Sequence, residues 1–165
     1  MNWVMEHMVE IRRLIEYNQT IRRQYFEAIS KVPWDELTRD RGASFGSIRN
    51  IFVHTLNSVT HWLEFLQGDP SYQRKSFDDY HSIKDLEDYM REVEQRIHTY
   101  LCSLTPPMLQ AEYEVTVGEH HENTDVTAED ILVHIFEEEV HHRGELIALL
   151  WQIGVKPPPM GWKQL

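Results

Sequence analysis

The sequence predicts an all-α protein built as a four-helix bundle, and three observations point to that fold class. Four segments carry apolar residues at spacings of three and four, the period of a helix with one buried face. Capping and stop signals bound these segments. Strand-like alternation is confined to one short stretch. With 165 residues, no internal repeat and no low-complexity linker, the chain is expected to form a single domain, residues 1–165.

The first two helices are predicted from about Asn2 to Lys31 and from Phe45 to Gln67. Val32-Pro33 ends the first, because proline has no amide hydrogen to continue the helical ladder. Ser44 precedes the second helix. Gly68-Asp69-Pro70 closes it, since glycine is favoured just past a helix end and proline shortly beyond. A loop through Arg39-Asp40-Arg41-Gly42 is expected between these two helices.

The other two helices are predicted from Ser82 to about Leu104 and from Thr127 to Gly154. Each begins with a hydroxyl residue followed three positions later by an aspartate, a capping arrangement that satisfies free amides at the positive end of the helix. Thr105-Pro106-Pro107 stops the third helix. Residues 71–81 are predicted to form a loop, and residues 108–123 a short extended segment that is too small to be a sheet, with alternating Tyr113, Val115 and Val117.

Composition excludes several classes of function. The chain is 41% hydrophobic and 11% aromatic, which is too apolar for a disordered protein. Sixteen basic against 27 acidic residues give a formal charge of −11, so a nucleic-acid partner is not expected. Cys102 is the only cysteine, which excludes an intrachain disulfide. Glu6, His7 and Glu10 interrupt any signal peptide, and no later run is long enough for a membrane span. A soluble, cytoplasmic protein without a membrane partner is expected.

Histidine is abundant, with ten residues, and the densest cluster lies in the fourth helix between His134 and Glu145. At about 100° per residue, His142 points inward with the apolar arc of this helix, and Glu138 lies at its edge. Glu138 and His142 are four residues apart, so their side chains can converge on one ion. The apolar arc consists of Ile131, Ile135, Leu146, Leu149 and Ile153.

The second helix can supply a third ligand. His54 belongs to a stripe at helical spacing that is expected to face the fourth helix. His54, Glu138 and His142 would then form a site of two histidines and one carboxylate with open positions for water or substrate. The members of the stripe are Ile51, His54, Thr55, Ser58, Trp62 and Phe65.

Other interpretations stay open at this point. A single buried histidine is more often a hydrogen-bonded core residue than a ligand. Residues 137–139 can be a solvated acidic face, although Glu139 turns toward the apolar arc and needs a partner, such as Arg143 or a ligand histidine. His7 and His134 are reserve ligands. The remaining histidines are expected on the surface or in loops: His61, His81, His98, His120 and His121.

A di-iron site is a further alternative. Glu138-x-x-His141 and Glu139-x-x-His142 both match the Glu-x-x-His element of ferritin-like bundles. Such a site requires a second element of this kind on another helix. The sequence contains none, so a single-ion site is favoured.

The chain resembles the DinB-like (YfiT-like) superfamily of small metal-binding four-helix bundles over nearly its whole length. The resemblance rests on Tyr17-Asn18, on residues 42–49 leading to His54 and Trp62, and on the segment from His134 to Leu146. Its most specific part is His141-His142-Arg143-Gly144-Glu145. It implies an up-down-type bundle with a long crossover.

The resemblance also implies a ligand set. In the family, one histidine on the second helix and two on the fourth, spaced by four, bind a divalent ion such as zinc, nickel, manganese or iron. Carried over, these ligands fall on His54, Glu138 and His142. Glu138 replaces a histidine, so either a carboxylate takes its place or the site has decayed. Val59 stands where a glutamate is common.

Some members of the superfamily are described as metal-dependent hydrolases, and some relatives are S-transferases that use a thiol such as bacillithiol. The resemblance therefore implies an ion that activates a small-molecule thiol or water. The rival is a non-catalytic metal-binding or interaction bundle with a decayed site. A homodimer is also expected, because several tryptophans exceed the needs of one small core: Trp3, Trp34, Trp151 and Trp162.

Overall fold

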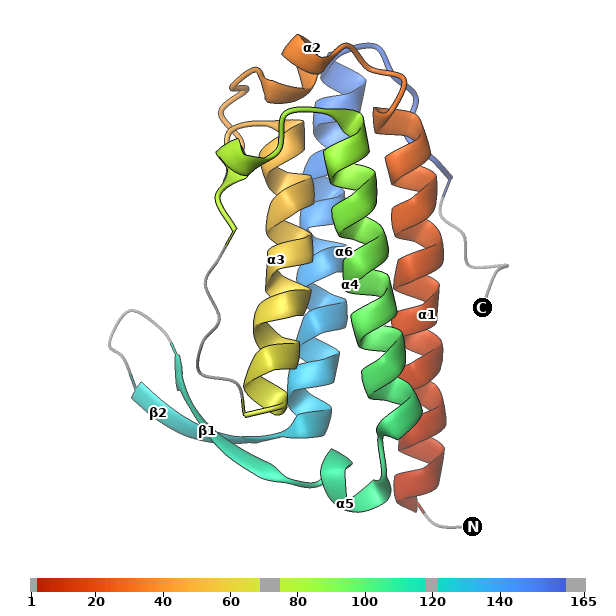
Figure 1. Cartoon of the computed structure of the whole chain (residues 1–165), viewed down its shortest axis with the longest axis vertical. Helices are drawn as coiled ribbons and strands as arrows, with labels where there is room; N and C mark the ends of the chain where they lie inside the picture. The colour runs from red at the N-terminus through yellow and green to blue at the C-terminus, as the bar shows by residue number, and fades with distance from the viewer. Residues whose placement is uncertain (1–2, 69–74, 118–121, 160–165) are drawn as a thin grey trace.

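A computed structural model of the chain describes residues 3–68, 75–117 and 122–159 and contains four long helices. These are α1 (Trp3–Ile29), α3 (Ile48–Leu66), α4 (Ile83–Ser103) and α6 (Ala128–Gln152). They pack side by side with their axes nearly parallel, as Figure 1 shows. The predicted all-α four-helix bundle is confirmed.

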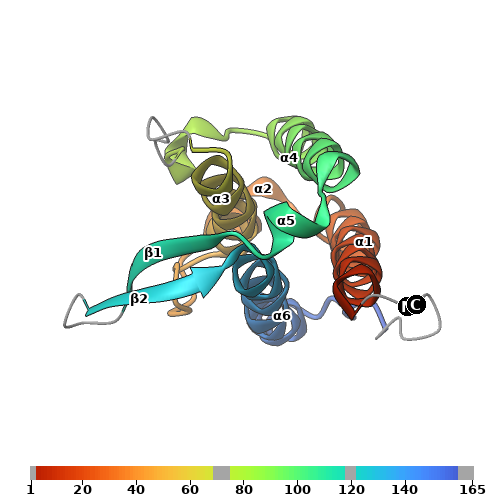
Figure 2. The ribbon, with the colours of Figure 1, turned by 90° about the horizontal axis from the view of Figure 1, so that it is seen from below.

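The connectivity includes the predicted long crossover. In Figure 1, α1 and α6 run in one direction along the bundle and α3 and α4 in the other. The link between α3 and α4 therefore has to return along the bundle, and it includes the short 3₁₀ helix η1 (Phe77–Asp79). Seen along the axis in Figure 2, α3 lies between α4 and α6, and α1 closes the ring on the opposite side. Helices α3 and α6 are thus antiparallel neighbours.

Short elements close the two ends of the bundle. Helix α2 (Trp34–Thr38) lies at one end, and α5 (Pro106–Leu109) lies at the other with a two-stranded antiparallel hairpin. The hairpin pairs β1 (Glu112–Val117) with β2 (Glu122–Thr127). The extended segment is confirmed as β1, but the expectation that it would not form a sheet was wrong. The second strand is almost entirely polar, so it exists through its pairing with β1 and not through a pattern of its own.

The start of the second long helix also differs from the prediction. Ser47, not Ser44, is its N-cap, because the Ser47 hydroxyl accepts the backbone amide of Asn50 at 3.2 Å. Gly46 has a φ of 79°, which a helix cannot continue through. Residues 43–46 instead form a tight turn, and this turn places the Phe45 ring against His54 of α3.

The predicted caps of the other helices are confirmed. The Ser82 hydroxyl accepts the amide of Asp85 at the start of α4. Thr127 and Asp130 form a reciprocal capping box at the start of α6. Gly154, with a φ of 72°, ends α6, and the next amide donates back to the Leu150 carbonyl at 2.9 Å. This is the hydrogen-bond pattern of a glycine-terminated helix.

The Asp130 cap predicts a pH-dependent contribution to stability. The hydrogen bonds from the Thr127 hydroxyl and amide hold the pKa of Asp130 below its ordinary value of 3.8. A depressed pKa stabilises the fold above the unfolded-state pKa, and this stabilisation is lost as the pH falls through the folded-state pKa. Asp130→Ala is expected to lower the urea midpoint at pH 6, and the difference from the parent should shrink toward pH 3. Asp125→Ala, on the exposed face of β2, is the control. An equal difference at both pH values would contradict the account.

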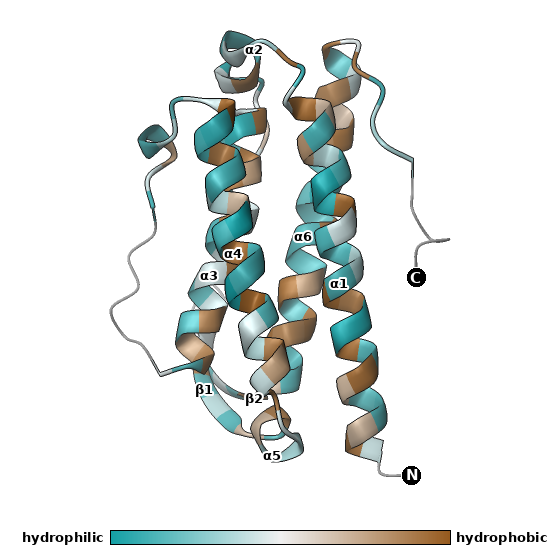
Figure 3. Cartoon of the chain, turned by 45° about the vertical axis from the view of Figure 1, so that its right-hand side comes forward, coloured by the Kyte–Doolittle hydropathy of each residue, from teal (hydrophilic) through white to brown (hydrophobic). Residues whose placement is uncertain are grey.

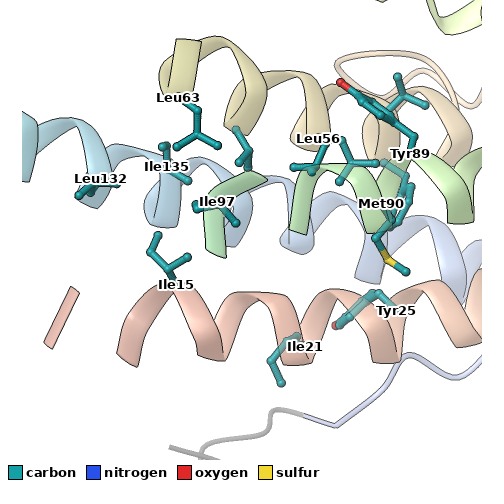
Figure 4. Close-up of a cluster of buried hydrophobic side chains, with 14 of the residues drawn as sticks. Ile15, Ile21, Tyr25, Leu56, Leu63, Tyr89, Met90, Ile97, Leu132 and Ile135 are labelled. Atoms are coloured by element: carbon teal, nitrogen blue, oxygen red, sulfur yellow. The ribbon is translucent and has the colours of Figure 1, made fainter. Parts of the chain in front are cut away.

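The core lies between the four helices. Hydrophobic residues gather on their inward sides and hydrophilic residues on their outer sides in Figure 3. Figure 4 shows side chains from all four helices meeting there, including Ile15, Leu56, Ile97 and Ile135. The fully buried residues of α3 include Phe52, Leu56 and Leu63 and also Ile51 of the stripe that contains His54. His54 lies next to this buried face, on the side toward Glu138 of α6. In the described part of the chain, no helix is long and apolar enough to span a membrane.

Candidate metal centre

The antiparallel pair α3 and α6 brings the three predicted ligands together. His54 Nε2 lies 2.9 Å from Glu138 Oε1, and His142 Nε2 lies 3.2 Å from the same oxygen. One donor atom from each of the three residues lies within 4.8 Å of the others. His54 is contributed by α3, whereas Glu138 and His142 rise from successive turns of α6. The three side chains predicted from helical spacing therefore do converge.

A second carboxylate orients His142. Glu145 Oε2 accepts a hydrogen bond from His142 Nδ1 at 2.5 Å. The opposite nitrogen, Nε2, faces Glu138, so it is the nitrogen that can bind an ion once it is deprotonated. In many metal sites, a carboxylate accepts a hydrogen bond from the ring nitrogen of a histidine ligand that does not bind the metal. This hydrogen bond fixes the tautomer and raises the basicity of the ring. The Ser44 hydroxyl and amide donate to Glu145 at 2.8 and 3.1 Å and hold it in place.

The loop before α3 covers the histidines. The Phe45 ring stacks on the His54 ring with a centroid distance of 3.8 Å and an interplanar angle of 21°. The same ring meets His142 edge-on at 5.4 Å. Ser44 and Phe45 therefore restrain both imidazoles, one through Glu145 and the other by stacking. The turn at residues 43–46 thus supplies contacts to both histidine ligands of the candidate site.

The carboxylates of the cluster remain ionised. Burial alone would raise the pKa of Glu138, but the hydrogen bond from His54 and the charges of His142, His54 and His134 outweigh it, and the pKa lies below its ordinary value. Burial likewise opposes the shift at Glu145, where hydrogen bonds from His142 and Ser44 lower the pKa. Two anionic carboxylates beside two imidazoles favour a cation at this position.

A cavity of about 150 Å³ opens beside the cluster between α3 and α6. It gives room for a ligand next to Glu138. Two further histidines line it. His134 was anticipated only as a reserve ligand, and His61 was expected on the surface, although it lies seven residues from His54 and thus on the same helix face. The seven-residue spacing from His54 is the sequence signal that indicates His61 at this cavity. The lining residues are His54, Asn57, Ser58, His61, Trp62, His134 and Glu138.

The other histidines lie away from the cluster or outside the described residues. His7 is hydrogen-bonded to Glu129 at 2.6 Å near the start of α6, so it is not a reserve ligand. His81 and His98 are exposed, as expected. His120 and His121 lie outside the described residues.

Glu139 has a different partner from the one proposed. Arg22 of α1 donates to it through Nε at 3.0 Å and Nη2 at 2.6 Å, and both side chains are less than 8% exposed. Arg143 instead donates to the Asn18 side chain at 2.7 Å and lies over the ring of Tyr17. Because Glu139 is committed to this ion pair, it is unsuited to serve in a di-iron element.

His141, His142 and Glu145 form a second group whose donor atoms lie close together. His141 is exposed, and His142 and Glu145 are already hydrogen-bonded to each other. Two of the three members of this second group are therefore the hydrogen-bonded pair in which Glu145 orients His142. The first group is the better candidate because its donors come from two helices and border the cavity.

The fold and the cluster together define a four-helix bundle with a candidate metal centre between two of its helices. The chain matches the DinB family over residues 5–164 and so belongs to that family. It is 23% identical to the uncharacterised protein YizA of Bacillus subtilis (strain 168) over 148 residues, which cover 88% of this chain and 89% of YizA. Its fold is similar to the crystal structure of a DinB-like protein (YjoA) from Bacillus subtilis, with a TM-score of 0.64, 17% identity, and coverage of 90% and 96% of the two chains.

Proposed function

We propose that this DinB family protein binds one divalent metal ion through His54 Nε2, Glu138 Oε1 and His142 Nε2. The observation that carries the proposal is the meeting of both imidazoles on one carboxylate oxygen, at 2.9 and 3.2 Å. Ligands about 2.1 Å from an ion lie about 3.0–3.4 Å apart along the edges of octahedral or tetrahedral coordination. The two distances to Glu138 Oε1 match this spacing, and the two histidine nitrogens lie within 4.8 Å of each other, so the cluster is close to the geometry that an ion requires.

The donor chemistry also fits. Neutral imidazole nitrogens and an ionised carboxylate oxygen are ligands for zinc, nickel, manganese and iron. With Glu145 accepting the Nδ1 hydrogen, His142 would bind an ion through Nε2 once that nitrogen is deprotonated. His54 would likewise bind an ion through a deprotonated Nε2, in place of its contact with Glu138. Three protein ligands would leave coordination positions open for water or a substrate, and the cavity borders the same residues.

We further propose a metal-dependent enzyme of the thiol S-transferase or hydrolase type. An ion held here lowers the pKa of a bound thiol or water and so supplies a nucleophile near neutral pH. The cavity admits a small-molecule thiol or another small substrate beside Glu138. His61 and His134 line the same space, and imidazoles exchange protons near neutral pH. In this proposal, one of these two rings would accept the proton that the nucleophile loses.

Activity separates this proposal from its rival, a bundle that binds metal without catalysis. Conjugation of monochlorobimane or fosfomycin to candidate thiols, with and without zinc, nickel or manganese, tests the transferase. Metal-dependent turnover that is lost in His142→Ala supports the enzyme. Stoichiometric metal binding with no turnover of any thiol or ester substrate supports the non-catalytic protein.

Glu138 sets the metal preference in this proposal. A carboxylate oxygen favours harder ions such as Mn²⁺ and Fe²⁺ more than a third imidazole would, and its charge makes the bound ion a weaker Lewis acid. Glu138→His is therefore expected to bind zinc and nickel more tightly and to raise any thiol-transfer rate. Glu138→Ala should bind every ion more weakly.

Competitive metal titrations of the parent, Glu138→His and Glu138→Ala proteins measure these effects. A matched substitution at the neighbouring exposed residue, Glu137→Ala, controls for the loss of one acidic charge. Equal affinities in all the proteins would remove Glu138 from the ligand set.

The protein is also proposed to form a homodimer. Among the expected tryptophans, Trp3 and Trp151 are each 58% exposed, Trp34 is partly buried against the core, and Trp162 lies outside the described residues. Trp151 shares the outer face of α6 with Val133 and Val140, at spacings of 18 and 11 residues. Light scattering is expected to give twice the chain mass of 19.7 kDa, and Trp151→Glu should shift the mass toward the monomer. A monomer at high micromolar concentration would contradict this.

A further inference from the structure

A second hollow lies next to the cavity at the candidate metal centre, and its walls are apolar. It has a volume of about 190 Å³ and lies between α3, α6 and the β-hairpin. Ligand sites in proteins are commonly concave, mostly apolar and equipped with a few polar groups that orient the ligand. The residues that line this apolar pocket are Trp62, Val115, Val126, Asp130, Ile131 and His134.

The hairpin provides one wall of the apolar pocket. Tyr113 pairs with Val126, and Val115 is two residues from Tyr113, so these three side chains share one face of the hairpin. Tyr113 anchors this face to the end of α3, because its ring contacts Phe65 at a centroid distance of 5.6 Å and its hydroxyl donates to the Leu66 carbonyl at 3.5 Å. The wall is thus fixed against the bundle.

The apolar pocket and the polar cavity share two residues. Trp62 and His134 line both of them, and their rings meet edge to face with centroids 5.3 Å apart. His134 is one turn from Glu138 on α6, about 6 Å along the helix, and Trp62 is eight residues from His54 on α3, about 12 Å. A small molecule of about that length can therefore reach from the apolar pocket to the candidate ligands.

We infer that the apolar pocket binds the neutral apolar end of a small substrate whose polar end lies at His54, Glu138 and His142. The part about the polar end rests on the proposed function, whereas the pocket itself does not. A cavity of about 150 Å³ can hold benzene, so this pocket accommodates one substituted ring or a short branched alkyl group. Asp130 disfavours an anionic tail, because its negatively charged carboxylate would repel one. Hydrogen bonds from the Thr127 amide and hydroxyl hold this carboxylate in place.

Toluene binding to the metal-free protein tests the apolar pocket without involving metal. Toluene is titrated into the protein while the methyl groups of Val115, Val126 and Ile131 are followed by NMR. Saturable shifts are expected at these methyls, with weaker binding of benzoate. Val126→Phe, which fills the pocket with a residue that strands tolerate, should weaken toluene binding at least tenfold. Val133→Phe, at an exposed position of α6, is the matched control and should bind as the parent does.

A second titration with 2-phenylethanethiol and zinc connects the apolar pocket to the metal centre. Zinc is expected to tighten binding of the thiol at least tenfold, and His142→Ala should remove this gain while toluene still binds. If toluene binds but zinc does not tighten thiol binding, the apolar pocket is supported and the proposed metal centre is rejected. Zinc-dependent thiol binding that does not shift the three methyls, or toluene binding that Val126→Phe leaves unchanged, would overturn the inference.

Discussion

His54→Ala and His142→Ala are each expected to lose the bound metal ion. Both imidazoles lie within hydrogen-bonding distance of Glu138 Oε1, so either substitution leaves two of three protein ligands. Substitutions of outer partners typically weaken metal binding about 10–100-fold, and the loss of a ligand should exceed that range. The measurement is the zinc or nickel content of each protein after dialysis against a chelator of known affinity.

Two variants calibrate this result. His98→Ala removes an exposed histidine on α4 and should retain the metal of the parent. Glu145→Gln removes the anionic acceptor of the His142 Nδ1 proton and should weaken binding by about 10–100-fold.

Because histidine ligands must be deprotonated, the metal affinity of the parent should also fall as the pH approaches about 6. Parent-like metal content in His142→Ala would move the site elsewhere.

The largest expected effect on stability comes from the buried Arg22–Glu139 pair. Both side chains are almost fully buried and share two hydrogen bonds between α1 and α6. Glu139→Met leaves an unpaired guanidinium in the core, and Arg22→Met leaves an unpaired carboxylate. Breaking a buried pair in this way costs about 3–5 kcal/mol of unfolding free energy. Urea denaturation of each single variant measures it.

The double variant Arg22→Met/Glu139→Met is the internal control for that prediction. It removes both charges, so it should recover much of the stability lost in either single variant. Glu27→Ala breaks an exposed pair with Lys31 and should change the unfolding free energy by less than about 1 kcal/mol. Additive losses in the double variant would show that the two charges do not stabilise each other.

The sequence predicted most of the fold because the decisive signals are local. Ser82, Thr127 and Gly154 bound helices through hydrogen bonds within a few residues, and such signals can be read along the chain. Strand β2 could not be predicted in the same way, since its apolar content is little more than Val126 and its hydrogen bonds go to β1. The α3 boundary was shifted because Ser44 and Ser47 both have capping side chains, and only the backbone at Gly46 decides between them.

The residues of the candidate site also divide into those that local spacing predicts and those whose roles depend on tertiary contacts. The approach of Glu138 and His142 follows from helical spacing, and His54 follows from its stripe on α3. The partner of Glu139 does not follow, because the pattern shows that it is buried but not that α1 is the neighbouring helix. The role of Glu145 depends on the turn that places Ser44 against α6, which is also a tertiary contact.

The position of a bound zinc ion is the strongest evidence for or against this metal centre. Crystals of the protein grown with one equivalent of zinc, and measured at the zinc absorption edge, give an anomalous difference map. One strong peak is expected between α3 and α6, about 2.0–2.2 Å from His54 Nε2, His142 Nε2 and a Glu138 oxygen. A peak held by other residues, or no peak among these three side chains, would contradict it.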